Sequence, residues 1–396
     1  MSFSADEWKN VVDELFSSEM KTLITNIAKS KGWEMDSILG SLYASSKPEA
    51  EEKTVIDHKT NIISCFKILI HKVNANDESA SAFKTREYSD TIKAISEYDG
   101  EIRTMEDIKS ILSNYGKKNP EKTLVKIKEI LETGTLEAAE KARKDEKVLA
   151  VNNLTKVYGI GNKKAVSLYK EYGIFTVESL KKKILELPDI LHDKQMIGIK
   201  YYDDLNERIP RIEMMAYEKI LLDIVEESGL ELKLSINGSY RRKMETSGDI
   251  DVLISSTHKG IRNKLIEILK TKKIVVETLA SGNKKFMGVS IIPGYTKYRH
   301  IDIIETKIEE YPFGVLYFTG SGGFNAKMRG MALDKGYSLN EYCLSNKKTK
   351  EPITEEEITS KIGKKYFEEE KDIFDFLGIE YVLPECRVNI TASKVQ

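Results

Sequence analysis

The spacing of apolar residues changes once along this chain of 396 residues, and that change limits the folds it can adopt. From Trp8 to about Ile212, apolar residues recur at helical spacing, as in Ile62, Phe66 and Leu69. From about residue 232, short apolar segments typical of strands alternate with helical ones. The sequence therefore predicts a multidomain chain, with an all-α N-terminal half and an α+β second half.

Four segments of the second half have the character of strands, and helical patterns separate them. The expected strands are residues 232–236, 250–254, 286–292 and 300–304. Residues 264–269 read as a helix, and the part after Pro312 mixes helix with short strands. The break between the two halves is expected near residues 215–235.

Charge is balanced over the whole chain but not along it. Lys and Arg number 62 and Asp and Glu number 63, so the net charge is −1. Residues 109–185, however, carry 17 basic against 9 acidic side chains, whereas residues 1–54 carry 6 against 10. A basic segment inside a neutral chain is typical of contact with a phosphate backbone, although solvated helix faces also produce it.

Several classes of protein are not expected. No segment reaches the ~18 consecutive apolar residues of a membrane helix. The acidic N-terminus does not read as a signal peptide. Cys65, Cys343 and Cys386 are widely spaced and form neither a disulfide framework nor a zinc motif. We expect an intracellular protein, nuclear or cytoplasmic, without a membrane partner.

The segment from Gly238 to Asp251 carries the strongest chemical pattern. Asp249 and Asp251 are two residues apart on an expected strand, so their carboxylates share one face, while Ile250 and Val252 point to the other. Upstream, Gly238 and Ser239 form a turn with room for a phosphate, and Arg242 adds a cation.

Asp302 lies on another expected strand that can run alongside the first. Carboxylates held close together repel each other, and a divalent cation relieves the repulsion. Mg²⁺ is the expected ion, two per site, with Mn²⁺ as an alternative. Glycine, serine, arginine and three aspartates together indicate nucleotidyl transfer, in which a 3′-hydroxyl attacks an α-phosphate and pyrophosphate leaves. The alternative is that an Asp-x-Asp pattern merely lies on the surface.

These motifs, Gly-Ser-Tyr-Arg-Arg followed by Ser-Gly-Asp-Ile-Asp, resemble the palm signature of the family X DNA polymerases, most closely DNA polymerase beta. The resemblance begins near residue 55 and reaches the C-terminus. It includes Lys285-Phe286-Met287-Gly288-Val289, and the run from Gly314 to Ser321. It then continues through Phe324-Asn325, Met328-Arg329, Asn340-Glu341-Tyr342 and Lys371-Asp372-Ile373-Phe374.

The resemblance implies a role for each matching residue. Asp249, Asp251 and Asp302 would bind the metal ions, and Asp302 would also accept the proton of the primer hydroxyl. Lys285 and Arg329 would contact DNA, Arg329 on the template strand. The residues that would bind the incoming dNTP are Arg208, Gly238, Ser239, Arg242, Ser247 and Gly248 at the triphosphate, Tyr317, Phe318 and Gly320 at the sugar, and Asn325 at the minor-groove edge of the base.

Four positions depart from the family pattern. Gly322 and Ala326 stand where the best-known relative has Asp and Lys against the base pair, which affects base stacking and fidelity. His300 and Ile304 replace two arginines that tune the carboxylates and the opening and closing of the enzyme. None of these changes removes an expected metal ligand.

Residues 154–165 have the form of a helix-hairpin-helix. Gly159 and Gly161 permit a tight turn that exposes backbone N–H groups to a phosphate, and Lys163 and Lys164 begin the next helix. A plain glycine connection between helices is the alternative. A second, degenerate hairpin is expected at residues 112–120. By resemblance, the carbonyl groups of Thr155, Val157 and Ile160 would bind a monovalent cation, Na⁺ or K⁺.

Lys122 and Lys126 lie one turn apart on an amphipathic helix, which by itself reads as an ordinary solvated helix. A lysine within such a cluster can act as a Schiff-base nucleophile. The resemblance places Lys126 where the family's lyase domain has its nucleophile. It also places Lys122 and Lys84 where that domain holds a 5′-phosphate.

The sequence thus predicts a template-directed polymerase that fills gaps in DNA repair, with 5′-deoxyribose-phosphate lyase activity. Gapped or nicked duplex DNA and dNTP would be its partners, and other repair proteins are left open. The alternatives are a template-independent transferase and a catalytically weak DNA-binding scaffold. The expected domains are a helical extension at 1–54, a lyase-like domain at 55–147, a helix-hairpin-helix thumb at 148–214, a palm at 215–311 and a nucleotide-selecting subdomain at 312–396.

Overall fold

The computed structural model describes residues 57–76, 81–96, 98, 100–114 and 121–387. The chain divides into two units between Ile56 and Asp57, and all described residues belong to the second unit. The expected helical extension at 1–54 lies outside the described residues, and so does most of the degenerate hairpin expected at 112–120.

The described residues between Lys59 and Leu154 are mostly helical, as expected, and those up to Ala139 enclose a core of their own. Buried Ile62, Phe66, Ile95, Ile127 and Ile130 contribute to it, since each helix turns one apolar face inward. The helices are α4 (Lys59–Asn76), α5 (Ser81–Ser96), α6 (Met105–Asn114), α7 (Glu121–Thr133), α8 (Glu137–Arg143) and α9 (Glu146–Leu154).

The next helices form a second helical core with α9, which includes Leu154, Ile160 and Leu168. A short turn joins two helices where the hairpin was expected: α9 ends at Leu154, and the next helix begins at Asn162. The helices of this part are α10 (Asn162–Tyr172), α11 (Val177–Glu186), η1 (Pro188–Ile190), α12 (Asp193–Lys200) and α13 (Tyr202–Asn206).

A five-stranded sheet occupies the middle of the second half, in the order β2-β4-β7-β6-β5. Only the β4–β7 pair is parallel. The two long helices α14 (Arg211–Ser228) and α16 (Ile261–Thr271) pack against one face of the sheet. The strands are β2 (Lys233–Ile236), β4 (Ile250–Ser255), β5 (Val275–Ser281), β6 (Lys285–Ser290) and β7 (Arg299–Thr306).

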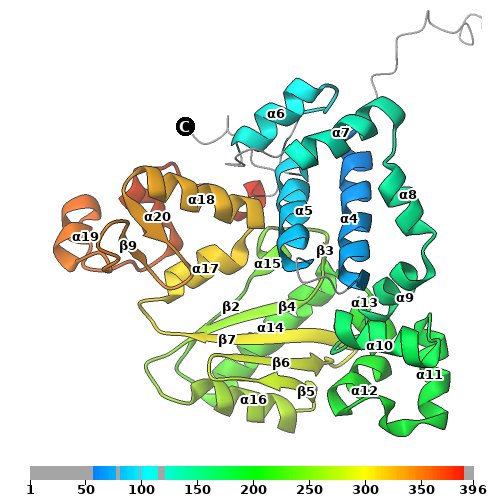
Figure 1. Ribbon diagram of the computed structural model, residues 1–396. Coiled ribbons are helices and arrows are strands. Elements are labelled where there is room, and N and C mark those ends of the chain that lie inside the picture. Colours follow the sequence, from blue (N-terminus) through cyan, green and yellow to red (C-terminus); the bar gives the residue numbers. More distant parts are fainter. Residues whose placement is uncertain (1–56, 77–80, 97, 99, 115–120, 388–396) are drawn as a thin grey trace, which may run out of the picture. The chain divides into compact units, whose positions relative to one another are not determined.

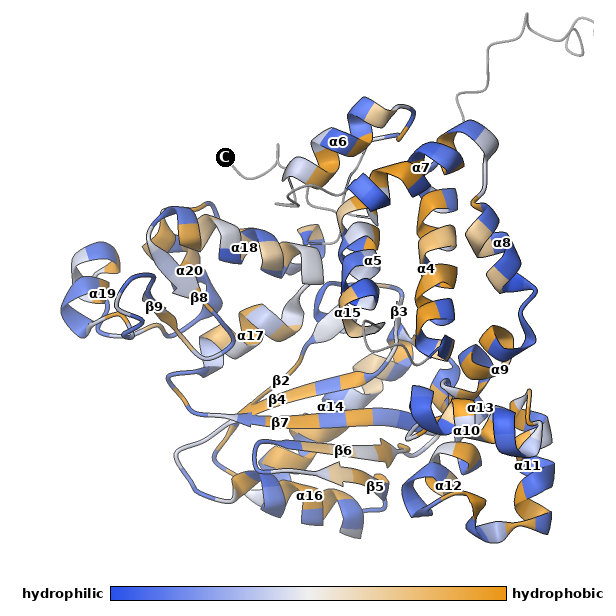
Figure 2. Ribbon diagram, in the orientation of Figure 1, coloured by the Kyte–Doolittle hydropathy of each residue, from blue (hydrophilic) through white to orange (hydrophobic). Residues whose placement is uncertain are grey.

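The four expected strands are all present, with slightly different ends. Strand β5 was not among them: it alternates poorly, and its pairing with β6 contains irregularities of register. Figure 2 shows β4 and β7 as largely hydrophobic, which suits strands in the middle of a sheet. A short ribbon of β1 (Ile209–Pro210) and β3 (Thr246–Ser247) lies outside this sheet, and α15 (Gly238–Arg241) follows β2.

The C-terminal part mixes helices with a two-stranded ribbon around buried aromatic residues, among them Phe313, Phe324 and Phe374. Buried Glu370 and Arg387 pair through two hydrogen bonds of 3.0 and 3.1 Å. The elements are α17 (Tyr311–Thr319), α18 (Gly322–Asp334), β8 (Tyr337–Leu339), β9 (Leu344–Asn346), α19 (Glu355–Ile362), α20 (Glu370–Leu377) and η2 (Pro384–Cys386).

Among the residues that the structure describes, no helix combines the length and the apolar character needed to span a membrane.

Candidate active site

Strands β4 and β7 bring two of the three expected aspartates side by side. Asp251 and Asp302 are partners in the parallel register, and Asp249 lies immediately before β4. Ile250 and Val252 point away from them into the core and are fully buried. Alternation along β4 and pairing with β7 therefore explain why the acidic residues meet on one face.

The turn after β2 approaches Asp251 closely, and its backbone conformation favours glycine. Gly238 has a positive φ of 61°, and a Cβ atom at this position would lie 2.8 Å from Oδ2 of Asp251. The N–H of Asn237 donates to the carbonyl oxygen of Asp251 at 2.8 Å. The glycine thus lets the turn lie directly against the carboxylate.

The expected triphosphate ligands gather around this turn. Ser239 and Ser247 are joined by a hydrogen bond of 3.0 Å between their hydroxyl groups. Arg208 donates to Thr246 from Nε at 2.6 Å and from Nη2 at 2.7 Å. Since β1 pairs with β3, Arg208 and Ser247 are neighbours although they are far apart in sequence.

Arg242 directly follows the short helix α15 of this turn. Its Nη1 donates to the carbonyl oxygen of Thr319 at 2.6 Å, while its Nε is buried and has no hydrogen-bond partner. Burial lowers the pKa of Arg242, and the charge of Asp251 opposes this shift. A buried guanidinium with an unused N–H is suited to an anion, since a bound phosphate would supply the missing acceptor.

The negative charges of the neighbouring carboxylates repel one another. Burial, followed by the charges of Asp249 and Asp302, raises the pKa of Asp251 to about 7. Asp302 is only 4% exposed, and its Oδ2 lies 2.6 Å from Nζ of Lys285, whereas its Oδ1 is buried without a hydrogen-bond partner. Lys285, expected to contact DNA, here neutralises part of the acidic cluster.

The three aspartates suit a divalent metal in part. Within the described ranges, no three His, Cys, Asp or Glu side chains are gathered closely enough to hold a metal on their own. Mg²⁺ seldom uses such a cage, because it keeps water and binds through one or two carboxylates and substrate phosphates. The unpartnered oxygen of Asp302 and the raised pKa of Asp251 both indicate that a cation would be favourable here.

The expected sugar and base contacts lie on α17 and α18. The rings of Tyr317 and Phe318 pack edge to face at 5.2 Å. Asn325 donates to the carbonyl oxygen of Tyr317 at 2.8 Å. The guanidinium of Arg329 lies 5.2 Å from the centre of the Tyr317 ring and 3.5 Å from Glu341. Gly320 has a positive φ of 64° and lies close to Arg242.

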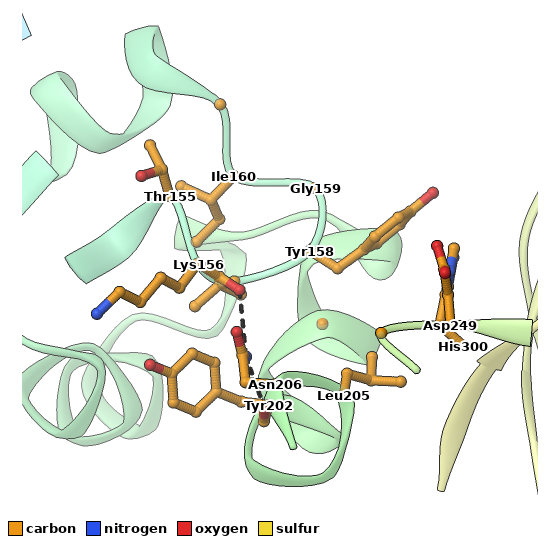
Figure 3. A pocket seen from close by; sticks show the side chains of 14 residues that line it. Thr155, Lys156, Tyr158, Gly159, Ile160, Tyr202, Leu205, Asn206, Asp249 and His300 are labelled. Carbon is orange, nitrogen blue, oxygen red and sulfur yellow. Dashed lines mark hydrogen bonds between the residues drawn. The ribbon is translucent and has the colours of Figure 1, made fainter. Parts of the chain in front are cut away.

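The hairpin turn lines one side of a cavity of about 600 Å³, and Asp249, before β4, and His300, on β7, line the other. Figure 3 shows the turn on one side of this cavity, with Asp249 and His300 across from it. The residues expected to bind a monovalent cation, Thr155, Val157 and Ile160, all line it. The carbonyl of Val157 already accepts the N–H of Ile160 at 3.0 Å. The cavity therefore connects the expected phosphate contacts with the carboxylate of Asp249.

Two residues that hold the hairpin turn were not found from the sequence. Buried Gln195 donates from Nε2 to the carbonyl oxygen of Gly159 at 2.9 Å. A Cβ atom on Gly198 would collide with the carbonyl oxygen of Tyr158, so glycine is required where α12 supports the turn. Neither residue belongs to a local motif, because each acts across more than 30 positions of sequence.

The lysines of the expected second site lie on α5 and α7. Nζ of Lys126 donates to the carbonyl oxygen of Lys122 at 3.0 Å and lies 5.9 Å from the centre of the Tyr88 ring. Lys84 is one turn from Tyr88 on α5. A hydrogen bond of 2.7 Å from Thr123 to Glu87 connects the two helices. The helices that carry these lysines pack around a different core from the strands that carry the aspartates.

Three family models match consecutive parts of the chain. Residues 208–307 match the DNA polymerase beta palm, residues 314–388 the DNA polymerase beta thumb, and residues 152–206 the fingers domain of DNA polymerase lambda. The chain belongs to the family X DNA polymerases. The models use "fingers" for the hairpin part that was expected as the thumb, and "thumb" for the C-terminal part. Membership of this polymerase family implies a divalent metal cofactor.

Relatives from this family match most of the length of this chain. It is 30% identical over 363 residues to DNA polymerase lambda of Arabidopsis thaliana and 28% identical over 355 residues to DNA polymerase lambda of Rattus norvegicus. It is 27% identical over 339 residues to the DNA polymerase/3′-5′ exonuclease PolX of Bacillus subtilis strain 168. The matches cover 83–86% of this chain but only 55–65% of the relatives.

Proposed function

We propose that the chain is a template-directed DNA polymerase that fills short gaps during DNA repair. The observation that carries this proposal is the parallel pairing of Asp251 with Asp302 beside the Gly238 turn and Arg242. This arrangement offers carboxylates for a metal next to an anion site for a triphosphate. Family membership and the names of the relatives support the same reading.

The chemistry follows from the positions of the side chains. Ser239, Arg242 and Ser247 would hold the triphosphate, and Arg208 would support the strand that carries Ser247. The primer 3′-oxygen then forms a bond to the α-phosphorus, the bond to the β-phosphate oxygen breaks, and pyrophosphate leaves. Asp302 accepts the hydroxyl proton at Oδ1, which has no hydrogen-bond partner, while Lys285 holds Oδ2. When bound by Asp249, Asp251 and Asp302, Mg²⁺ would stabilise the charge that develops on the phosphate.

Primer extension on single-stranded, recessed and one-nucleotide-gapped substrates tests this function directly. We expect the fastest extension on the gapped duplex and insertion only of the nucleotide complementary to the template. Equal addition to a single strand without a template would indicate the template-independent transferase. Only eight residues, 291–298, connect β6 to β7, whereas such transferases tend to have a longer loop there. DNA binding without extension would indicate the scaffold.

The helix-hairpin-helix is proposed to bind the DNA backbone. The N-terminus of α10 presents backbone N–H groups after Gly161, and Lys163 is exposed beside them. We also propose that carbonyl groups of Thr155, Val157 and Ile160 bind a Na⁺ or K⁺ ion shared with a phosphate, since these residues line the cavity.

Replacing Lys163 and Lys164 with alanine is expected to weaken binding to all DNA sequences alike. Each lost phosphate contact should reduce the slope of log affinity against log salt by about 0.9. Fluorescence anisotropy with two unrelated gapped duplexes over a salt series measures both quantities. Lys347→Ala and Lys350→Ala, far along the chain, serve as controls. An unchanged affinity, or a loss that depends on sequence, would contradict the hairpin assignment.

We propose a second activity, 5′-deoxyribose-phosphate lyase, for the helical domain. Lys126 would form a Schiff base with the sugar aldehyde, and Lys122 and Lys84 would hold the 5′-phosphate. The half-buried position of Lys126 against Tyr88 supports this, because the ring and the carbonyl of Lys122 restrict its side chain. Loss of the C2 proton then breaks the bond to the 3′-oxygen, and hydrolysis of the imine frees the lysine.

Lys126→Ala is expected to lose most covalent trapping on a 5′-deoxyribose-phosphate end in borohydride, while nucleotide insertion stays within about threefold, since the palm has its own core. Trapped protein is quantified on denaturing gels. Lys128→Ala, an exposed lysine on the same helix, is the matched control. Undiminished trapping by Lys126→Ala would transfer the role to Lys122 or Lys84, and no trapping by the wild type would restrict this domain to DNA binding.

A further inference from the structure

One aromatic side chain extends from the hairpin turn across the cavity to His300 on strand β7. The ring of Tyr158 lies 5.9 Å from the imidazole ring of His300, measured between centroids and tilted by 41°. Figure 3 shows Tyr158 directed from the turn toward Asp249 and His300. This contact joins the hairpin turn, which is proposed to bind phosphates, to the palm. No local sequence motif includes both residues.

His300 in turn lies close to the carboxylate of Asp302. It lies two residues before Asp302 on β7, and its Nε2 is 3.7 Å from Oδ1 of Asp302. Both atoms are buried and have no hydrogen-bond partner among the described residues. Burial, and then the charge of Asp302, raises the pKa of Tyr158, which places the phenol within the field of the same carboxylate. Tyr158, His300 and Asp302 thus form a continuous row.

Residues of α12 hold the backbone around Tyr158 in place. Gly198 permits α12 to pack directly against its carbonyl group, and Gln195 holds the neighbouring Gly159. The Tyr158 side chain packs on the small apolar cluster of Tyr201, Leu279 and Val289, which includes residues of β5 and β6. The ring is therefore positioned by both the hairpin part and the sheet.

We propose that Tyr158, supported by His300, is a positioning residue that sets the sugar of the primer terminus against Asp302. This rests on the proposed polymerase function and adds a determinant to it. The hairpin can bind backbone phosphates and the carboxylates require the 3′-hydroxyl, so the last nucleotide of the primer must pass between them. A flat aromatic face at this point can pack against a deoxyribose or a terminal base without hydrogen bonds, and so without sequence preference.

The experiment compares three variants on a gapped duplex. At saturating dNTP, Tyr158→Ala should lower the single-turnover rate by about tenfold, because misplacement of reacting atoms slows chemistry. Its Kd for the DNA should change by less than about threefold, since the phosphate contacts remain. Tyr158→Phe keeps the ring and should recover most of the rate. Tyr172→Ala, an exposed tyrosine at the end of α10, is the matched control.

A double-mutant cycle with His300→Ala tests the pair. If Tyr158 acts through His300, the double variant should be little slower than either single one. Fully additive losses would overturn the pairing, and a Tyr158→Ala rate equal to that of the control would overturn the positioning role. A Tyr158→Phe variant as slow as Tyr158→Ala would overturn the stacking explanation.

A readout that needs no catalysis separates this proposal from the polymerase function. With 2-aminopurine at the primer terminus and no dNTP, Tyr158→Ala should change the fluorescence of the terminus, whereas Tyr172→Ala should leave it as in the wild type. An altered signal in a protein that extends no primer would support the position of Tyr158 and overturn only the polymerase proposal. An unchanged signal in a protein that extends primers would overturn the role of Tyr158.

Discussion

Asp251→Asn should lower nucleotide insertion by about a thousandfold, which corresponds to about 4 kcal/mol of transition-state free energy. Asp251 lies in register with Asp302 and against Gly238, so its carboxylate is shared by the proposed metal site and the triphosphate turn. Asparagine preserves the shape of the side chain but removes its charge. Single-turnover extension on a gapped duplex measures the loss.

The same variant should fold normally and bind DNA with nearly wild-type affinity. Burial and two neighbouring carboxylates raise the pKa of Asp251 to about 7, so the folded state gains nothing from its charge at neutral pH. Asp223→Asn, on the outer face of α14 and paired only with Lys219, is the control for loss of an aspartate. Extension by Asp251→Asn within about tenfold of the wild type would contradict the metal-site assignment.

Glu370→Gln should destabilise the folded protein by about 3–5 kcal/mol, because it leaves a buried cation without its counter-charge. Arg387 is fully buried and pairs with both carboxylate oxygens of Glu370. Arg241 and Tyr381 bind the same carboxylate at 2.7 and 2.6 Å. Urea denaturation, followed by aromatic fluorescence, measures the change in free energy of unfolding.

Asp375→Asn on the same helix is the matched control, since its pair with Lys371 is exposed and should contribute less than about 1 kcal/mol. Burial opposes ionisation of Glu370, but hydrogen bonds from Arg241 and Arg387 outweigh it and lower its pKa. The contribution is therefore present above the ordinary glutamate pKa and is lost as pH falls through the lowered folded value. Equal destabilisation by the two variants would contradict the buried network.

The elements around the candidate site were predictable because their signals are local. Alternation places Asp249 and Asp251 on one face of β4, and a positive φ at Gly238 agrees with the glycine expected at the turn. Two glycines around Ile160 likewise predicted the tight turn that separates α9 from α10. In each case, a few neighbouring residues carry both the pattern and its physical reason.

Contacts between distant segments were not predictable from such patterns. Nothing near Lys285 in the sequence indicates that its ammonium group pairs with Asp302, because this depends on the register of β6 against β7. Tyr158 meets His300 only after the hairpin part and the sheet have packed. The binding of Glu370 by Arg241 likewise joins segments more than 100 residues apart.

The ion pair between Lys285 and Asp302 has a consequence for how this protein matures. If the acidic cluster could fold only around a bound metal ion, a newly made chain would remain incompletely folded until the ion bound. Here the chain supplies its own cation. Lys285 lies on β6, next to β7, and its Nζ is 2.6 Å from Oδ2 of Asp302. We therefore expect the palm to fold without free divalent ions, and a metal ion that binds to replace the positive charge of Lys285 at Asp302. Chelators are accordingly expected to silence the protein without unfolding it.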